Sequence, residues 1–168
     1  MRGREFQVLL KGATIANFRA LEDVEIQLDK LITLIVGRNN SGKTSFVNLF
    51  EKFYGDDVKF VLEDFSARSI RDIKSALDLY ARSRAYHDAG EAETSEELVA
   101  QACALLPTVR LSLTIEYGEE EDLAGISDLI LDLDENCFEV KIESTLAVTS
   151  PQSFLADFHT ARDRKSVV

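Results

Sequence analysis

The stretch LIVGRNNSGKTSFVNLF, from Leu34 to Phe50, constrains the fold more than any other part of the chain. It overlaps the run 31–36, in which five of six residues are apolar, as in a strand covered on both faces. Apolar positions then recur at helical spacing as far as Tyr54, and Gly55 is a natural helix terminator. The pattern therefore predicts a strand, a glycine-bearing loop and a helix, in that order.

The loop from Gly37 to Thr44 fits the pattern G-x-x-x-x-G-K-[ST]. Its glycines allow the backbone to curl so that successive N–H groups point at phosphate oxygens, and the helix start adds a positive end. Lys43 is placed to reach the β- and γ-phosphates, the Thr44 hydroxyl to bind Mg²⁺, and Ser45 to lie near the α-phosphate. The alternative, a glycine turn with an incidental lysine, is weakened because a random chain of this length matches less than about 1% of the time.

The middle of the chain has two helical patterns. Residues 69–84 are amphipathic, with Ser69 as the expected N-cap. A polar stretch, HDAGEAETSEE, is expected to break the helical structure. A second helix should follow, with Thr94 and Glu97 at capping-box spacing, and should stop before Pro107.

The remaining segments have the period of strands. Residues 6–16 and 22–29 form one predicted pair, and 109–117 alternates apolar and polar side chains. DLILDLD and CFEVKIE repeat this alternation over short links, which indicates an antiparallel meander. We expect a single, partial domain over 1–168. Its segments are 1–55 (strands, loop and first helix), 56–107 (helical), 108–147 (antiparallel β) and 148–168 (tail).

The composition favours a soluble cytoplasmic protein. No apolar run approaches the about 18 residues that a membrane span needs, and the cysteines and histidines have no metal-ligand spacing. The net charge is −11, and residues 56–168 hold 24 of the 30 acidic residues. This acidity argues against a broad nucleic-acid footprint on the segment itself, but does not exclude DNA binding by a longer parent protein or a partner.

The first third of the chain resembles the N-terminal part of the ABC-type P-loop ATPase domains of OLD, RecF and SMC proteins, within the AAA family. The segments that carry the resemblance are IANFRALEDVEIQL, the apolar run and GRNNSGKTS. The resemblance lies in the N-F-R segment at 17–19 and in the loop, where Asn40 replaces a frequent glycine and favours the OLD group. It implies an α/β P-loop NTPase lobe with an antiparallel β subdomain and a helical insertion. It also implies ATP and Mg²⁺ as cofactors, with Thr44 as the metal ligand. The implied nucleotide-binding residues are Gly37, Asn39, Asn40, Ser41, Gly42, Lys43, Thr44, Ser45 and Arg19. For Arg19, a surface arginine after a strand is an equal alternative.

Two parts of such an ATPase are not evident in the sequence. There is no LSGG-like signature segment, and the one Walker B candidate, 129–135, is interrupted by Asp132. The period of two indicates a plain strand and an acidic turn there, with Asp134 and Glu135 structural. Catalytic residues remain unassigned, and the segment alone is not expected to be catalytically complete.

The leading hypothesis is therefore the ATP-binding lobe of an OLD/RecF/SMC-like ATPase that acts in DNA repair, maintenance or phage defence. Its expected partners are the remainder of the parent ATPase, a second copy in a homodimer, and DNA only indirectly. The alternative is a non-hydrolysing nucleotide-binding module that switches a partner protein. An unrelated P-loop GTPase or kinase is disfavoured because the chain has no N-K-x-D guanine motif.

Overall fold

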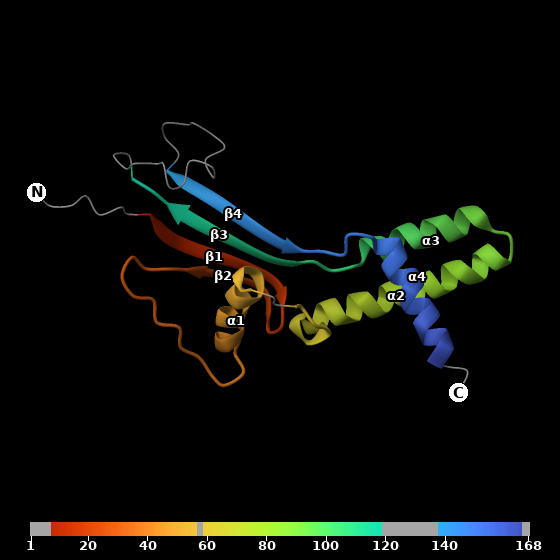
Figure 1. The fold of residues 1–168 in the computed structure, drawn as a ribbon, viewed down its shortest axis with the longest axis horizontal. Coiled ribbons are helices and arrows are strands. Elements are labelled where there is room, and N and C mark those ends of the chain that lie inside the picture. The colour runs from red at the N-terminus through yellow and green to blue at the C-terminus, as the bar shows by residue number, and fades with distance from the viewer. Residues whose placement is uncertain (1–7, 57–58, 119–137, 166–168) are drawn as a thin grey trace, which may run out of the picture.

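A computed structural model describes residues 8–56, 59–118 and 138–165. These residues form a mixed α/β structure in which a sheet and α1 lie at one end and three helices lie at the other (Figure 1). The elements are β1 (Leu9–Phe18), β2 (Leu21–Gln27), α1 (Lys43–Tyr54), the 3₁₀ helix η1 (Leu62–Asp64), α2 (Ala67–Asp88), α3 (Ala92–Ala104), β3 (Val109–Glu116), β4 (Glu139–Leu146) and α4 (Pro151–Lys165).

The four described strands form one antiparallel sheet in the order β2-β1-β3-β4. Ile15 on β1 pairs with Val24 on β2 and with Leu111 on β3, so β1 joins the two predicted strand regions. The predicted strand pair near the N-terminus and the antiparallel pair β3–β4 are confirmed, with shifted ends. The sequence did not predict that β1 and β3 are neighbours. The predicted strand DLILDLD lies outside the described residues.

The main core lies between one face of the sheet and α1. Alternation places Ala13 and Ile15 of β1 on the same buried face, and Leu49 of α1 is fully buried against them. Partly buried phenylalanines of α1 surround this contact. The core comprises Ala13, Ile15, Phe18, Leu21, Leu49, Val109, Leu111 and Leu113. The sheet therefore holds α1, and with it the preceding loop, in place.

A second, smaller core joins α2, α3 and α4. Ala76 and Ala102 are fully buried where α2 and α3 meet, and Leu155 of α4 packs into the same cluster. The segment after residue 150 was expected to be a tail, but it begins with the helix α4. The apolar residues Phe154, Leu155 and Phe158 have the spacing of one helix face, which explains why the segment becomes helical when α2 and α3 cover it.

Two predicted helix boundaries are wrong. The α2 helix begins at Ala67 with Ser66 as its N-cap, because Ser66 Oγ accepts a hydrogen bond from Ser69 N at 3.1 Å. Ser69 is thus inside the first turn. The α3 helix begins at Ala92, before Thr94, and the expected polar break shrinks to the three residues between the two helices. Ser66 and Ser69 can both cap a helix, so the local pattern could not distinguish them at α2. The N-cap of α3 is Glu91, which makes no side-chain capping hydrogen bond, so no capping residue marks that start.

The predicted buried strand at 31–36 is also wrong for the described structure. This segment has no regular secondary structure, and Leu31 and Leu34 are 91% and 81% exposed. Its start is held by a short-range turn, in which Asp29 N donates to Thr33 Oγ1 at 2.7 Å and Leu31 N donates to Asp29 Oδ1 at 3.2 Å. No strand in the described part of the chain pairs with it. An apolar run specifies burial, but burial also requires a neighbouring strand.

Candidate functional site

The glycine-bearing loop makes a tight turn directly before α1. Residues 39 and 40 form the turn, with Asn40 at φ +68°, and Ser41 N donates to Arg38 O at 3.3 Å. Gly42 is the N-cap of α1 and has φ +91°, in the left-handed region that favours glycine. The predicted loop-to-helix junction is thus present, with Lys43 as the first residue of the helix.

Gly42 stands where a side chain would be strained, whereas a side chain at Gly37 would require only the exposed Ser41 hydroxyl to turn away. A Cβ atom at Gly42 would lie 2.7 Å from Leu21 Cδ2 and 3.8 Å from Ala20 Cβ. A Cβ atom at Gly37 would lie 2.6 Å from Ser41 Oγ. The loop is therefore closely wound, and the β1–β2 turn supports it from one side. A closely wound loop at a helix start is the arrangement that a phosphate-binding loop requires.

The Lys43 side chain folds back over the loop. Its Nζ donates to the carbonyl oxygens of Gly37 at 2.7 Å and Arg38 at 2.6 Å. Its ammonium group is thus held against the loop, and Lys43 is the first residue of α1, so both the charge and the helix end favour an anion nearby. Ser41 Oγ lies 3.4 Å from the same Nζ. The structure therefore brings together the loop backbone, the cation and the helix end.

The other predicted loop residues are accessible from solvent. Asn39, Asn40, Ser41 and Thr44 are exposed, and Ser45 is half-buried in the first turn of α1. The Thr44 hydroxyl, predicted as a ligand of Mg²⁺, is thus accessible at the helix start. These residues fit a nucleotide with its metal ion in chemical type, because they supply a cation, hydroxyls and backbone N–H groups.

Arg19, the predicted site residue from outside the loop, lies in the β1–β2 turn with φ +50°. Its Nη2 and Nε donate to Asp64 Oδ1 at 2.7 and 3.1 Å, and its guanidinium group lies 5.1 Å from the centre of the Phe18 ring. The next two residues, Ala20 and Leu21, are the ones that a Cβ atom at Gly42 would meet. Arg19 is thus close to the loop in the fold, but its described ion-pair partner is a protein carboxylate.

Asp64 is a buried ionic residue that sequence reasoning missed. Its Oδ2 accepts hydrogen bonds from Lys52 Nζ at 2.8 Å and from Val61 N at 3.0 Å, and its side chain is fully buried. Burial raises the pKa of Asp64, but the hydrogen bonds from Lys52, Val61 N–H and Arg19 together lower it below the ordinary value. No local pattern indicates this site, because Arg19 and Asp64 are 45 positions apart.

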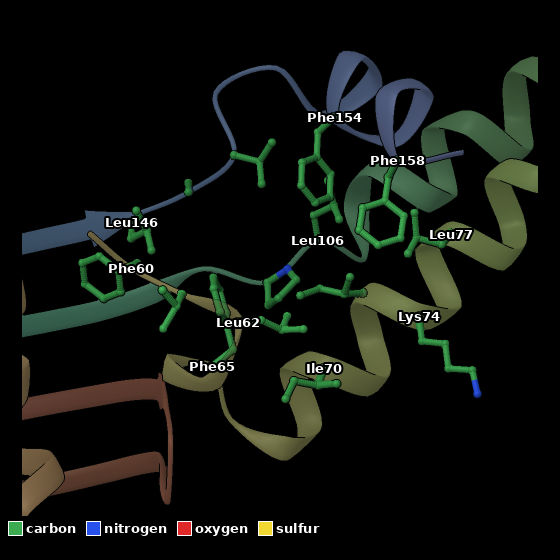
Figure 2. Close-up of a pocket in the computed structure, with 15 residues that line it drawn as sticks. Phe60, Leu62, Phe65, Ile70, Lys74, Leu77, Leu106, Leu146, Phe154 and Phe158 are labelled. Atoms are coloured by element: carbon green, nitrogen blue, oxygen red, sulfur yellow. The ribbon is translucent and has the colours of Figure 1, made fainter. Parts of the chain in front are cut away.

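A separate cavity of about 550 Å³ lies between the sheet end and the helices (Figure 2). Its lining is apolar except for Lys74, whose amino group points away from the cavity (Figure 2). Phe154 and Phe158 of α4 face the segment that contains η1, and Leu62 and Phe65 form part of the opposite wall. The segment around Asp64 therefore has an ionic side toward α1 and an apolar side toward this cavity.

Three other features of the described residues concern metal ligands, the free cysteine and membrane spans. There, no group of three or more His, Cys, Asp or Glu residues is arranged to hold a metal ion. Cys103 is half-buried, and burial raises the pKa of its thiol. None of the described helices is long and apolar enough to cross a bilayer. The Walker B candidate at 129–135 lies outside the described residues.

Comparison with known proteins identifies the family. The family model of an AAA ATPase domain matches residues 10–157, which is most of the chain. The chain therefore belongs to the AAA ATPase domain family. The four-stranded antiparallel sheet and four α-helices of its described residues are consistent with that assignment, and the family supports ATP binding. No curated protein and no solved structure matches the chain.

Proposed function

We propose that the chain binds ATP with Mg²⁺ in the loop Gly37–Ser45. The observation that carries this proposal is the junction at Gly42 and Lys43. Gly42 has a φ of +91°, which favours glycine, and Lys43 Nζ donates to the loop carbonyls of Gly37 and Arg38. In this proposal, loop N–H groups and Lys43 bind the phosphates, and the Thr44 hydroxyl binds Mg²⁺. The metal ion would neutralise phosphate charge. Membership of the AAA ATPase domain family supports the same ligand.

We further propose that the chain is the ATP-binding lobe of a longer ATPase of the OLD/RecF/SMC group, acting on DNA in repair, maintenance or phage defence. The support is the N-F-R segment at 17–19 together with the GRNNSGKT loop. The exposed apolar run at 31–36 also supports it, because such a run is stable when further strands cover it. The sequence has no LSGG-like segment, so a second subunit and the remainder of the parent would complete the site.

Calorimetric titration with MgATP tests the loop. Lys43→Ala should weaken binding by at least about 1.5–3 kcal/mol, the range for hydrogen bonds to charged groups. Lys30→Ala is the matched control, since it removes an exposed lysine from the segment before the loop. Equal affinities of the wild type and Lys43→Ala would refute the phosphate-binding role. Equal losses in both variants would show that only overall charge matters.

Hydrolysis separates the two functional hypotheses. Phosphoryl transfer needs a positioned water and charge neutralisation beyond a phosphate cradle. Residues 1–168 should therefore release phosphate at the background rate and stay monomeric with ATP, whereas the full-length parent should hydrolyse ATP and dimerise around it. Turnover by residues 1–168 above about 0.01 per second that disappears in Lys43→Ala would reveal a complete active site. A parent that binds but never hydrolyses ATP would favour the regulatory module.

A further inference from the structure

Asp64 connects three segments that are distant in sequence. Its carboxylate accepts hydrogen bonds from Arg19 in the β1–β2 turn, from Lys52 near the end of α1, and from Val61 N in its own segment. The backbone strengthens the first connection, since Arg19 N donates to Asp64 O at 2.9 Å. Ser66 N also donates to Asn17 O at 3.0 Å. The segment around Asp64 is therefore tied to the end of β1 by both backbone and side chain.

The guanidinium group of Arg19 also connects Asp64 to α1, through Asn48. With the Asn48 amide oriented so that both of its groups are satisfied, its oxygen accepts from Arg19 Nη1 at 2.9 Å. Its nitrogen then donates to Thr44 O at 3.2 Å. A continuous chain of hydrogen bonds thus runs from Asp64 through Arg19 and Asn48 to Thr44, in the first turn of α1.

This connection is stiff for physical reasons. The arginine donors form a planar fork, so two bonds to one carboxylate oxygen and one to Asn48 define the plane and direction of the group. The carboxylate is fully buried, so releasing Arg19 or Lys52 would leave a charge poorly compensated away from water. Asn17 at the end of β1 and Arg19 in the turn have φ values of +63° and +50°, which are costly for non-glycine residues and persist only where surrounding contacts hold them.

We propose that Asp64 is a positioning residue of the nucleotide site, which holds Arg19, and through Asn48 the first turn of α1, in the geometry that MgATP binding requires. This inference rests on the proposed function of the Gly37–Ser45 loop. Ala20 of the same turn and Leu21 at the start of β2 lie beside Gly42, since a Cβ atom there would be 3.8 Å from Ala20 Cβ and 2.7 Å from Leu21 Cδ2. A displacement of Arg19 would therefore also reach the loop backbone. Asp64 acts only through these neighbours.

The experiment measures MgATP affinity and thermal unfolding for the same set of variants. Asp64→Asn keeps the shape of the side chain and removes its charge. Glu63→Gln removes a carboxylate charge from the adjacent, exposed position of η1 and is the matched control. Asn48→Ala interrupts the chain of hydrogen bonds from the other end, at a half-buried position. Arg19→Ala, alone and combined with Asp64→Asn, completes a double-mutant cycle.

Asp64→Asn and Asn48→Ala should each weaken MgATP binding at least about fivefold, measured well below the unfolding temperature of each variant. Glu63→Gln should match the wild type. Asp64→Asn should cause no further loss when Arg19 is already alanine, because the two act as one unit. If Asp64→Asn lowers the unfolding temperature while both it and Asn48→Ala bind MgATP like the wild type, the ion pair is merely structural and the inference is overturned.

Failure of the inference and failure of the proposed function give different results. Suppose that the wild type binds MgATP and Lys43→Ala does not. If Asp64→Asn and Asn48→Ala then bind like the wild type, only the positioning role is rejected. A wild type that does not bind MgATP rejects the loop as its site, and the positioning role with it. If Asp64→Asn does not fold, Asn48→Ala decides: weakened binding supports the role of the chain of hydrogen bonds, and unchanged affinity overturns it.

Discussion

Gly42→Ala should destabilise the protein through two separable effects. The backbone at Gly42 has φ +91°, where an L-residue costs about 1–2 kcal/mol. The new Cβ atom would also lie 2.7 Å from Leu21 Cδ2, and Leu21 belongs to the sheet–α1 core. Overpacking of this kind costs about 1–3 kcal/mol. The expected total loss of unfolding free energy is therefore about 2–5 kcal/mol.

The chain contains a matched control for the backbone effect. Gly90 has φ +83°, but nothing lies within 4 Å of a Cβ built on it. Gly90→Ala should therefore cost only the conformational part, about 1–2 kcal/mol. The difference between the two variants, measured by urea unfolding, gives the packing part. In a Leu21→Ala background, Gly42→Ala should cost about as much as Gly90→Ala, because the atom that it overlaps has been removed.

Equal unfolding free energies for Gly42→Ala and Gly90→Ala would refute the packing argument. If Gly42→Ala also retained the MgATP affinity of the wild type, the loop would not need glycine at this position. The cradle geometry would then lose its main structural support. If Gly42→Ala lost MgATP binding but kept the unfolding free energy of the wild type, only the loop conformation would have changed. That result would contradict a rigid contact with Leu21.

Three further predictions follow from the same structure. Because the pKa of Asp64 is lowered in the folded state, its contribution to stability is present above the unfolded-state value of about 3.9 and lost as pH falls through the folded-state pKa. Urea midpoints of the wild type should therefore fall more steeply below about pH 4 than those of Asp64→Asn, and parallel curves would contradict this sign. Leu155→Ala should cost about 2–5 kcal/mol by emptying the α2–α3–α4 core, and a cost below about 1 kcal/mol would mean that α4 is not packed there. Substituting Asp134 and Glu135 by Asn and Gln in the longer ATPase proposed above should leave ATP turnover within a few-fold, whereas a loss of about 10²-fold would identify a Walker B pair.

The sequence alone determined the features that depend on neighbouring residues. The loop-to-helix junction at 37–54, the end of its helix at Gly55 and the existence of strand β3 were all predicted from local patterns. The burial of β3 does not alternate as its sequence does, because Ser112 is buried as well as Leu111 and Leu113. Each of these predictions depends on spacing within a few residues, because glycine conformation, helix periodicity and strand alternation are local properties. The residues that could bind phosphate were predicted for the same reason, and their role in binding stays a prediction.

The tertiary structure decided everything that depends on distant partners. The pairing of β1 with β3, the burial of Leu155 by α2 and α3, and the ionic contacts of Asp64 all join residues far apart in the sequence. The run 31–36 is exposed because it lacks such distant partners. Its composition predicts a buried strand, but no strand among the described residues covers it. Composition sets the free energy to be gained by burial, but only the packing of other segments determines whether a residue is buried and which charge it meets.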